Sequence, residues 1–167
     1  MRAQPPEHLL ADRFATPIGE ALLVTDELGQ LRALDFVDHE ERMLRLLRLH
    51  YGAAALQRGA APAAIRHALE AYFGGRLNAL ASITYATAGT PFQRSVWSAL
   101  TTIAAGETLS YAALAQRIGR PMAVRAVGLA NGSNPLGIVV PCHRVIGSNG
   151  SLTGYAGGLS RKTRPIA

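Results

Sequence analysis

The chain of 167 residues has a single cysteine, Cys142, which excludes an internal disulfide and a multi-cysteine zinc site. It also lacks any uninterrupted apolar run near the roughly 18 residues that a membrane-spanning helix requires. Its first residues lack the apolar core of a signal peptide. We therefore expect a cytoplasmic protein with no membrane anchor and no metal site.

Acidic residues are scarce in the second half of the chain. Residues 90–167 carry eight Lys or Arg against one acidic residue, Glu107, which gives +7. Residues 1–89 carry nine Arg against ten acidic residues, which gives −1. This asymmetry favours a polyanionic partner such as nucleic acid for the second half, although a solvated basic surface without a partner explains the charge equally well.

The first half shows the alternating pattern of a small α/β domain. Strands are predicted between turn-forming segments, at residues 12–15, 21–25 and 31–37. Apolar residues at helical spacing predict helices at 39–50 and 65–73, and the Ala/Gly-rich stretch 51–64 is predicted to be a loop. The histidines of this half lack the grouping of a metal site. We assign residues 1–85 to this domain and 86–89 to a linker.

The second half, residues 90–167, reads as mainly helical. Thr90 caps a helix with Pro91 at its first position and Gln93 three residues after the cap. Ser110 caps a second helix that Gly119 closes. A third helix is predicted from Pro121 to about Asn131, so that the last two helices form a helix-turn-helix pattern.

The third helix is unusual for a helix that reads DNA, because its side chains are small. It carries Ala123, Ala126, Gly128 and Ala130 in place of the long polar side chains that read base edges in the major groove. Small residues permit close approach to a narrow groove. They equally permit tight packing against a neighbouring helix, and the residues alone do not choose between these.

The candidate nucleophile is Cys142, followed directly by His143 and Arg144. The apolar run 137–140 before it is predicted to be a strand that Pro141 ends. Cationic or proton-accepting neighbours favour the thiolate, the nucleophilic form of cysteine. A lone cysteine is otherwise a small buried apolar residue.

Ordered motifs around this cysteine are similar to those of the O6-alkylguanine-DNA alkyltransferase family. The matching segments are Thr90-Pro91-Phe92-Gln93, Ser110-Tyr111, Arg125-Ala126-Val127-Gly128, Asn131-Gly132-Ser133-Asn134-Pro135, Pro141-Cys142-His143-Arg144-Val145 and Gly154-Tyr155-Ala156-Gly157-Gly158. The resemblance implies an α/β two-domain fold, with a small ribonuclease H-like N-terminal domain and a winged-helix-like, helix-turn-helix C-terminal domain. It implies single-turnover repair of O6-alkylguanine or O4-alkylthymine, with no cofactor.

The resemblance also assigns the catalytic roles. Cys142 would accept the alkyl group, and His143 would take the thiol proton through a bridging water. Asn134 would orient the local backbone. Tyr111 would help to rotate the damaged nucleotide outward and would bond ring N3.

The partner implied is double-stranded DNA, bound by a monomer through the minor groove. Ala123, Ala126 and Gly128 would press against that groove. Arg125 would occupy the place of the flipped nucleotide, since a protein thiol cannot reach a base substituent inside the stack.

The flipped base would lie in a pocket formed mainly by the last motif. Tyr155 would stack on the ring, and the amide of Ala156 would bond the guanine oxygen. The carbonyls of Cys142 and Val145 would bond the exocyclic amine.

Members of the family continue into a helix ending Leu-Leu-x-His-Glu, whose glutamate orients the histidine; here it would fall just beyond Ala167. We therefore expect slower transfer from this sequence than from one extended by such a helix. One alternative is a sensor that binds alkylguanine without repairing it. A helix-turn-helix regulator explains the basic half but not the Cys-His pair, and a cysteine hydrolase explains the pair but not the basic half.

Overall fold

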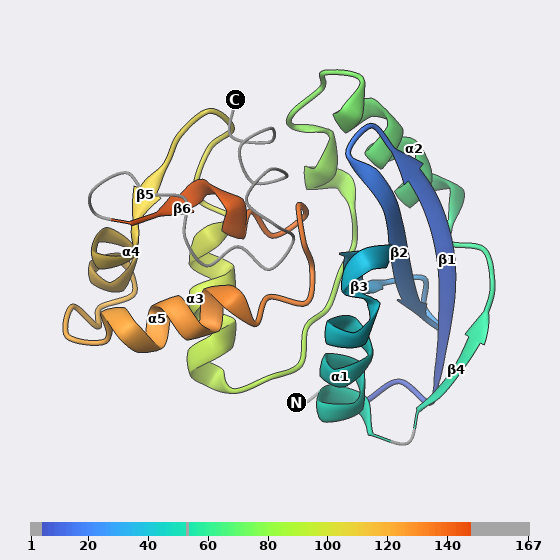
Figure 1. The fold of residues 1–167 in the computed structure, drawn as a ribbon, viewed down its shortest axis with the longest axis horizontal. Coiled ribbons are helices and arrows are strands. Elements are labelled where there is room, and N and C mark those ends of the chain that lie inside the picture. The colour runs from blue at the N-terminus through green and yellow to red at the C-terminus, as the bar shows by residue number, and fades with distance from the viewer. Residues whose placement is uncertain (1–4, 53, 148–167) are drawn as a thin grey trace. The chain divides into compact units, whose positions relative to one another are not determined.

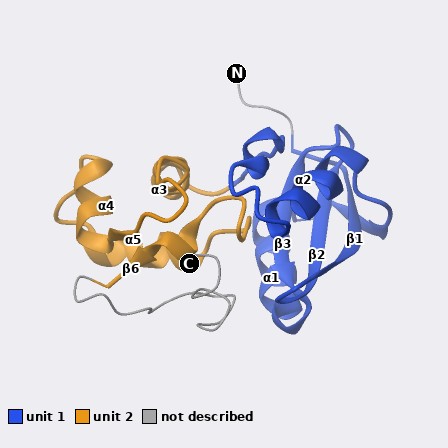
Figure 2. Cartoon of the chain, turned by 90° about the horizontal axis from the view of Figure 1, so that it is seen from above, with its two compact units in different colours: residues 1–88 blue, residues 89–167 orange. Residues whose placement is uncertain are grey.

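The computed structural model describes residues 5–52 and 54–147, which form a mixed α/β fold. The chain divides into two compact units, Met1–Ala88 and Gly89–Ala167 (Figure 2). None of the helices in these described ranges is long and apolar enough to cross a membrane.

Unit 1 is built on a four-stranded sheet with the order β3-β2-β1-β4 (Figure 1). Its strands are β1 (His8–Thr16), β2 (Gly19–Asp26), β3 (Leu31–Phe36) and β4 (Ala55–Arg58). The first three pair antiparallel in sequence, and β4 pairs parallel with β1. The helical elements of the unit are η1 (Val37–His39), α1 (Glu40–Tyr51), α2 (Ala63–Phe73) and η2 (Ala79–Ser82).

Strands β2 and β3 are buried along most of their length, because both faces of the sheet are covered. On one face, Leu22 and Val24 pack with Met43 and Leu47 of α1. Successive side chains of a strand point to opposite faces. The alternate residue Leu23 is therefore buried on the other face, and its exposed fraction is 0%.

The predicted strands and helices of unit 1 are present, but the prediction that 51–64 is a loop is wrong at β4. All four residues of this edge strand are exposed, so neither face had to be apolar. The sequence Ala-Leu-Gln-Arg accordingly lacks the alternation of apolar and polar residues by which a strand is recognised. Pairing with β1 defines it instead, from His8 opposite Ala55 to Ala11 opposite Arg58.

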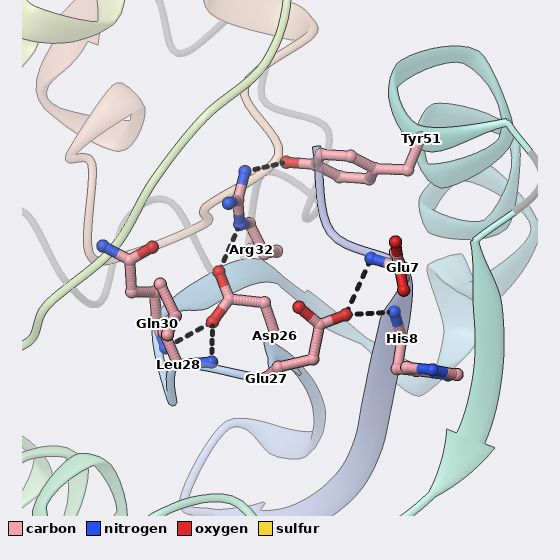
Figure 3. Close-up of polar contacts among 8 residues, drawn as sticks. All are labelled: Glu7, His8, Asp26, Glu27, Leu28, Gln30, Arg32 and Tyr51. Carbon is pink, nitrogen blue, oxygen red and sulfur yellow. Dashed lines mark hydrogen bonds and ion pairs between the residues drawn. The ribbon is translucent and has the colours of Figure 1, made fainter. Parts of the chain in front are cut away.

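A buried ion pair ties the β2–β3 turn to α1 (Figure 3). The carboxylate of Asp26 accepts hydrogen bonds from the backbone amides of Leu28 and Gln30, both at 2.9 Å, and from Nε of Arg32 at 2.8 Å. Arg32 also donates to the hydroxyl of Tyr51 in α1 at 3.5 Å. Because both charges are paired and hydrogen-bonded, their burial is tolerated.

The described part of unit 2, up to residue 147, contains three α-helices and a short parallel ribbon. Its elements are α3 (Pro91–Leu100), β5 (Leu109–Ser110), α4 (Tyr111–Arg117), α5 (Val124–Gly132), η3 (Cys142–Arg144) and β6 (Val145–Ile146). The predicted capping box at Thr90 is confirmed, with reciprocal bonds between Thr90 and Gln93 at 3.0 and 3.1 Å. Helix α3 buries one face into the core of the unit, through Val96, Trp97 and Leu100.

The third helix begins later than the sequence predicted. Pro121 lies in a turn that closes when the amide of Ala123 donates to the carbonyl of Arg120 at 2.9 Å, and α5 starts at Val124. Proline at a helix start and proline in a turn share the same backbone φ, so the residue alone does not distinguish them. Gly119, with φ of +75°, follows the C-cap Ile118 of α4 and closes that helix as predicted.

We predict that Gly89→Ala destabilises the protein more than Gly75→Ala. Both glycines have similar positive φ, +118° and +110°, so both variants carry the backbone strain of about 1–3 kcal/mol. A Cβ at Gly89 would lie 2.9 Å from the buried ring of Trp97 and 2.8 Å from Oε1 of Gln93, whereas at Gly75 it would meet nothing within 4 Å. Overpacking should therefore add about 1–3 kcal/mol at Gly89 alone. Denaturant unfolding measures the free energy of unfolding of both variants. Equal losses of stability in the two would contradict the packing explanation.

Candidate active site

Cys142 opens η3 at the end of two consecutive tight turns. The amide of Val139 donates to the carbonyl of Gly137, and the amide of Cys142 donates to the carbonyl of Val140, both at 2.8 Å. Pro141, with φ −81° and ψ 61°, is the central residue of the second, an inverse γ-turn. The strand predicted at 137–140 is therefore wrong, because these residues form turns that hydrogen bonds within the segment close.

The first of these turns is strained. Ile138 has φ of 70°, a conformation that β-branched residues rarely adopt. A residue held in this way costs about 1–3 kcal/mol and persists only where its surroundings over-determine it. Ile138 is almost fully buried, so packing as well as hydrogen bonding holds the turn in place.

The side chain of Asn134 organises the segment that leads to Cys142. Its Nδ2 donates to the carbonyl of Val140 at 2.9 Å and to that of Leu136 at 3.3 Å. Its Oδ1 accepts from the amide of Leu136 at 3.0 Å. One buried side-chain amide thus bonds to three backbone groups of this segment. The predicted orienting residue lies where it can fix the approach of the chain to the thiol.

Two further contacts hold η3 itself. Nη1 of Arg144 donates to the carbonyl of Ile103 after α3 at 2.7 Å, and Nδ2 of Asn131 in α5 donates to the carbonyl of Cys142 at 3.4 Å. Cys142 is 5% exposed and His143 is fully buried. The Cys-His pair therefore lies in the interior of unit 2, where fixed protein groups replace most of the solvent around it.

Strand pairing brings the predicted tyrosine to the same region. In the β5–β6 ribbon, Leu109 lies opposite Val145 and Ser110 opposite Ile146, so Tyr111 follows directly beside the segment after η3. A Cβ added at Gly128 would meet Cδ1 of Tyr111 at 4.0 Å. The structure thus gathers Tyr111, Gly128 and Val145, three residues far apart in sequence, in one part of unit 2.

The outer face of α5 carries Arg125 among small and apolar residues. Arg125 and Ala126 are exposed and Ala123 is half-buried, whereas Val127 and Ala130 face the core. Two exposed apolar residues that the sequence analysis did not single out, Met122 and Leu129, are 96% and 70% exposed. Met122 stands three residues before Arg125 and Leu129 four residues after it. This helical spacing places them on the same side as Arg125 and could have identified them from the sequence.

The basic surface of unit 2 is smaller than the charge count suggested. Arg144 is buried and bonded to Ile103, so it does not contribute to a surface for a polyanion. The exposed basic residues in the described part of the unit are Arg94, Arg117, Arg120 and Arg125.

The predicted pocket residues Tyr155 and Ala156 lie outside the described residues. Across residues 5–52 and 54–147, no group of three or more His, Cys, Asp or Glu side chains could hold a metal ion.

Comparison with known proteins gives a consistent result. Residues 91–167 match the family model described as "6-O-methylguanine DNA methyltransferase, DNA binding domain". The chain is 49% identical over 156 residues to a methylated-DNA--protein-cysteine methyltransferase of Shigella flexneri, covering 92% of this chain and 91% of the relative. It is 45% identical over 151 residues to the protein of that name from Methanosarcina barkeri, covering 90% of both.

The fold agrees with solved structures. The crystal structure of Mycobacterium tuberculosis OGT in complex with DNA matches with a TM-score of 0.77 and 40% identity, covering 95% of this chain and 90% of that one. The crystal structure of M. tuberculosis O6-methylguanine methyltransferase matches with a TM-score of 0.76 and 39% identity, with the same coverage. The chain belongs to the methylated-DNA--protein-cysteine methyltransferase family.

Proposed function

We propose that this protein repairs DNA by direct reversal, transferring the alkyl group of O6-alkylguanine to Cys142. One observation carries the assignment of the acceptor: the single thiol of the chain lies at the end of a turn that Asn134 clamps, directly before a buried histidine. The family relatives are named for transfer to a protein cysteine, and no other cysteine is present here.

The chemistry is a displacement at the alkyl carbon. The thiol of Cys142 gives its proton to His143, and the thiolate sulfur then forms a bond to the alkyl carbon while the bond from that carbon to O6 breaks. The electron pair of the broken bond leaves with guanine, whose anion takes up a proton. The product thioether does not revert, so each protein molecule acts once.

Access to the damaged base requires the nucleotide to leave the stack. Arg125 supports this step because it is exposed on α5, where its side chain can fill the space that the base vacates. Tyr111 would help to turn the nucleotide, and Ala123, Ala126 and Gly128 would let the helix approach the minor groove closely. Duplex DNA is the partner, and we propose that the protein binds it as a monomer.

The base pocket completes the site. The carbonyls of Cys142 and Val145 would bond the exocyclic amine, and Tyr155 and Ala156 would supply the stacking ring and the amide for the guanine oxygen. At the level of the domains, we propose that unit 1 is the ribonuclease H-like domain and that α4 and α5 form the helix-turn-helix of a winged-helix-like domain. Their limits are proposed as residues 1–85 and 90–167, with the linker at 86–89.

The alternative of a sensor that binds alkylguanine without repair is disfavoured. Such a protein has no need of a nucleophile, whereas Cys142 is present and held in a defined turn. The relatives that match over nine-tenths of the chain are methyltransferases by name.

Incubation with a duplex containing O6-methylguanine should add one methyl group per protein molecule, located at Cys142 by peptide mass spectrometry. Cys142→Ser should abolish transfer and retain duplex binding, because the hydroxyl keeps the shape of the side chain and loses the nucleophile. Repeated turnover, or methylation at another residue, would refute the mechanism.

Arg125→Ala should slow repair in a duplex at least tenfold more than it slows reaction with free O6-benzylguanine, since the free base needs no flipping. Arg94→Ala is the matched control, because Arg94 is also exposed in unit 2 but lies on α3. Its effect should be small on both substrates. Equal losses for Arg125→Ala on the two substrates would show that Arg125 supports the fold instead.

A further inference from the structure

Strand β4 has an open edge in the part of the chain that the structure describes. It is the last strand in the sheet order, and its one paired edge faces β1 (Figure 1). The amides of Ala55 and Gly59 donate to carbonyls at and just before β1, at 3.0 and 3.1 Å. Because successive residues of a strand direct their backbone groups to opposite edges, the N–H and C=O groups of Leu56 and Arg58 face outward.

The side chains of Leu56 and Arg58 lie on the face of the sheet that α1 covers. Leu56 is opposite Leu9 in β1, and Arg58 is opposite Ala11. Residues opposite each other in adjacent strands share a face, and Leu9 belongs to the core that packs on α1. Leu56 is nevertheless 41% exposed, so α1 leaves much of this side chain uncovered.

Two hollows meet at Leu56, between α1 and the edge of the sheet. The larger has a volume of about 620 Å³ and an apolar floor that includes Ala11, Leu22 and Leu56. The smaller has a volume of about 180 Å³ and reaches the buried Leu9. The larger one falls within the roughly 300–1,000 Å³ of ligand sites. Together they form an apolar groove beside the open edge, which we call the β4 groove.

Arginines lie at both ends of the β4 groove. Arg48 of α1 lines the smaller hollow and Arg58 the larger one. Both are exposed, and neither forms an ion pair with any residue within 5–52 or 54–147. Glu40 of α1 is the acidic lining residue left without an ion pair in the same ranges, so the unpaired charge of the lining is positive. The other lining charges are paired, Asp12 with Arg66 at 2.8 Å and Arg13 with Glu20 at 3.5 Å.

An open strand edge beside an apolar groove suits an extended peptide. The outward N–H and C=O groups of β4 can pair with an added strand, whose alternate side chains enter the groove. The excess of arginine favours carboxylates on that strand. A second copy of this chain would instead bring the same positive groove ends together, and charged side chains on an edge disfavour such self-pairing.

We propose that the β4 groove binds an extended acidic segment of a partner protein. The segment adds a strand to β4, places an apolar side chain beside Leu56, and brings carboxylates to Arg48 and Arg58. This surface belongs to unit 1, and the proposal does not depend on the alkyl transfer assigned to Cys142.

The probe is the heptapeptide Thr-Asp-Val-Leu-Val-Asp-Thr, acetylated and amidated at its ends. In a strand, its two Asp and its Leu share one face. A second peptide carries Lys in place of Asp. Calorimetry measures binding to the whole chain, and NMR shifts of the Leu56 and Arg58 amides locate the site. The acidic peptide should bind at least about tenfold more tightly than the basic one.

Two N-methylated forms of the acidic peptide test backbone pairing on the wild-type protein. One is methylated at the amides of its even positions and the other at those of its odd positions. Successive amides of a strand face opposite edges, so only one form loses the donors that would face β4. That form should bind at least about tenfold more weakly, and the other should stay within about threefold of the unmodified peptide.

Arg58→Glu tests the charge on the protein. This variant should bind the acidic peptide at least about tenfold more weakly and the basic peptide more tightly. Arg76→Glu is the matched control, because Arg76 is also exposed in unit 1 and lines neither hollow. It should change neither affinity by more than about twofold, since solvent and salt screen distant charges.

Equal binding of the acidic and basic peptides, or equal binding of the two methylated forms, would overturn the proposal. An effect of Arg76→Glu as large as that of Arg58→Glu would overturn it too. If Arg58→Glu weakened binding of duplex DNA while the wild type bound neither peptide, the groove would be a nucleic-acid surface instead. Dimerisation of the wild type that shifts the Leu56 and Arg58 amides would assign the groove to a second copy and equally refute the proposal.

Discussion

The site depends on the hydrogen bonds that a single side-chain amide, Asn134, makes to the backbone before the nucleophile. The segment between Asn134 and Cys142 makes tight turns, and one of its residues, Ile138, has a backbone conformation that is costly for a β-branched side chain. Asn134 adds a second donor to the carbonyls of Leu136 and Val140, which also accept from the amides of Val140 and Cys142, and it is the recorded acceptor for the amide of Leu136. The position of the thiol follows from that clamp, because the last turn begins at Val140, whose carbonyl Asn134 holds.

The remaining elements of unit 2 act as fixed supports around this segment. Helix α3 carries the core and provides, just after its end, the carbonyl that Arg144 binds. Helix α5 connects an exposed face containing Arg125 with a buried end that contacts the backbone of Cys142. A displacement of α5 on DNA would therefore be transmitted to the reactive turn through a single short helix. In the proposed function, substrate recognition and nucleophile positioning share this scaffold.

The sequence predicted those parts of the structure whose cause is local. The capping box at Thr90 and the turn at Gly119 were recognisable because each depends on residues within one turn. The prediction failed where tertiary hydrogen bonds decide the conformation. The apolar run 137–140 has the composition of a buried strand, but its residues form turns, the last of which Asn134 holds through the carbonyl of Val140. The exposed strand β4 is defined by its pairing with β1.

The most direct test of this account is single-turnover transfer from free O6-benzylguanine by Asn134→Asp. This variant keeps an oxygen that can accept from the amide of Leu136 and loses the donor to the carbonyls of Leu136 and Val140. We expect transfer to fall by up to about a hundredfold, as for a misplaced reacting group, while duplex affinity stays within about twofold because α5 is untouched. An unchanged rate in a variant that still folds and binds duplex DNA would contradict the claim that Asn134 presents the thiol.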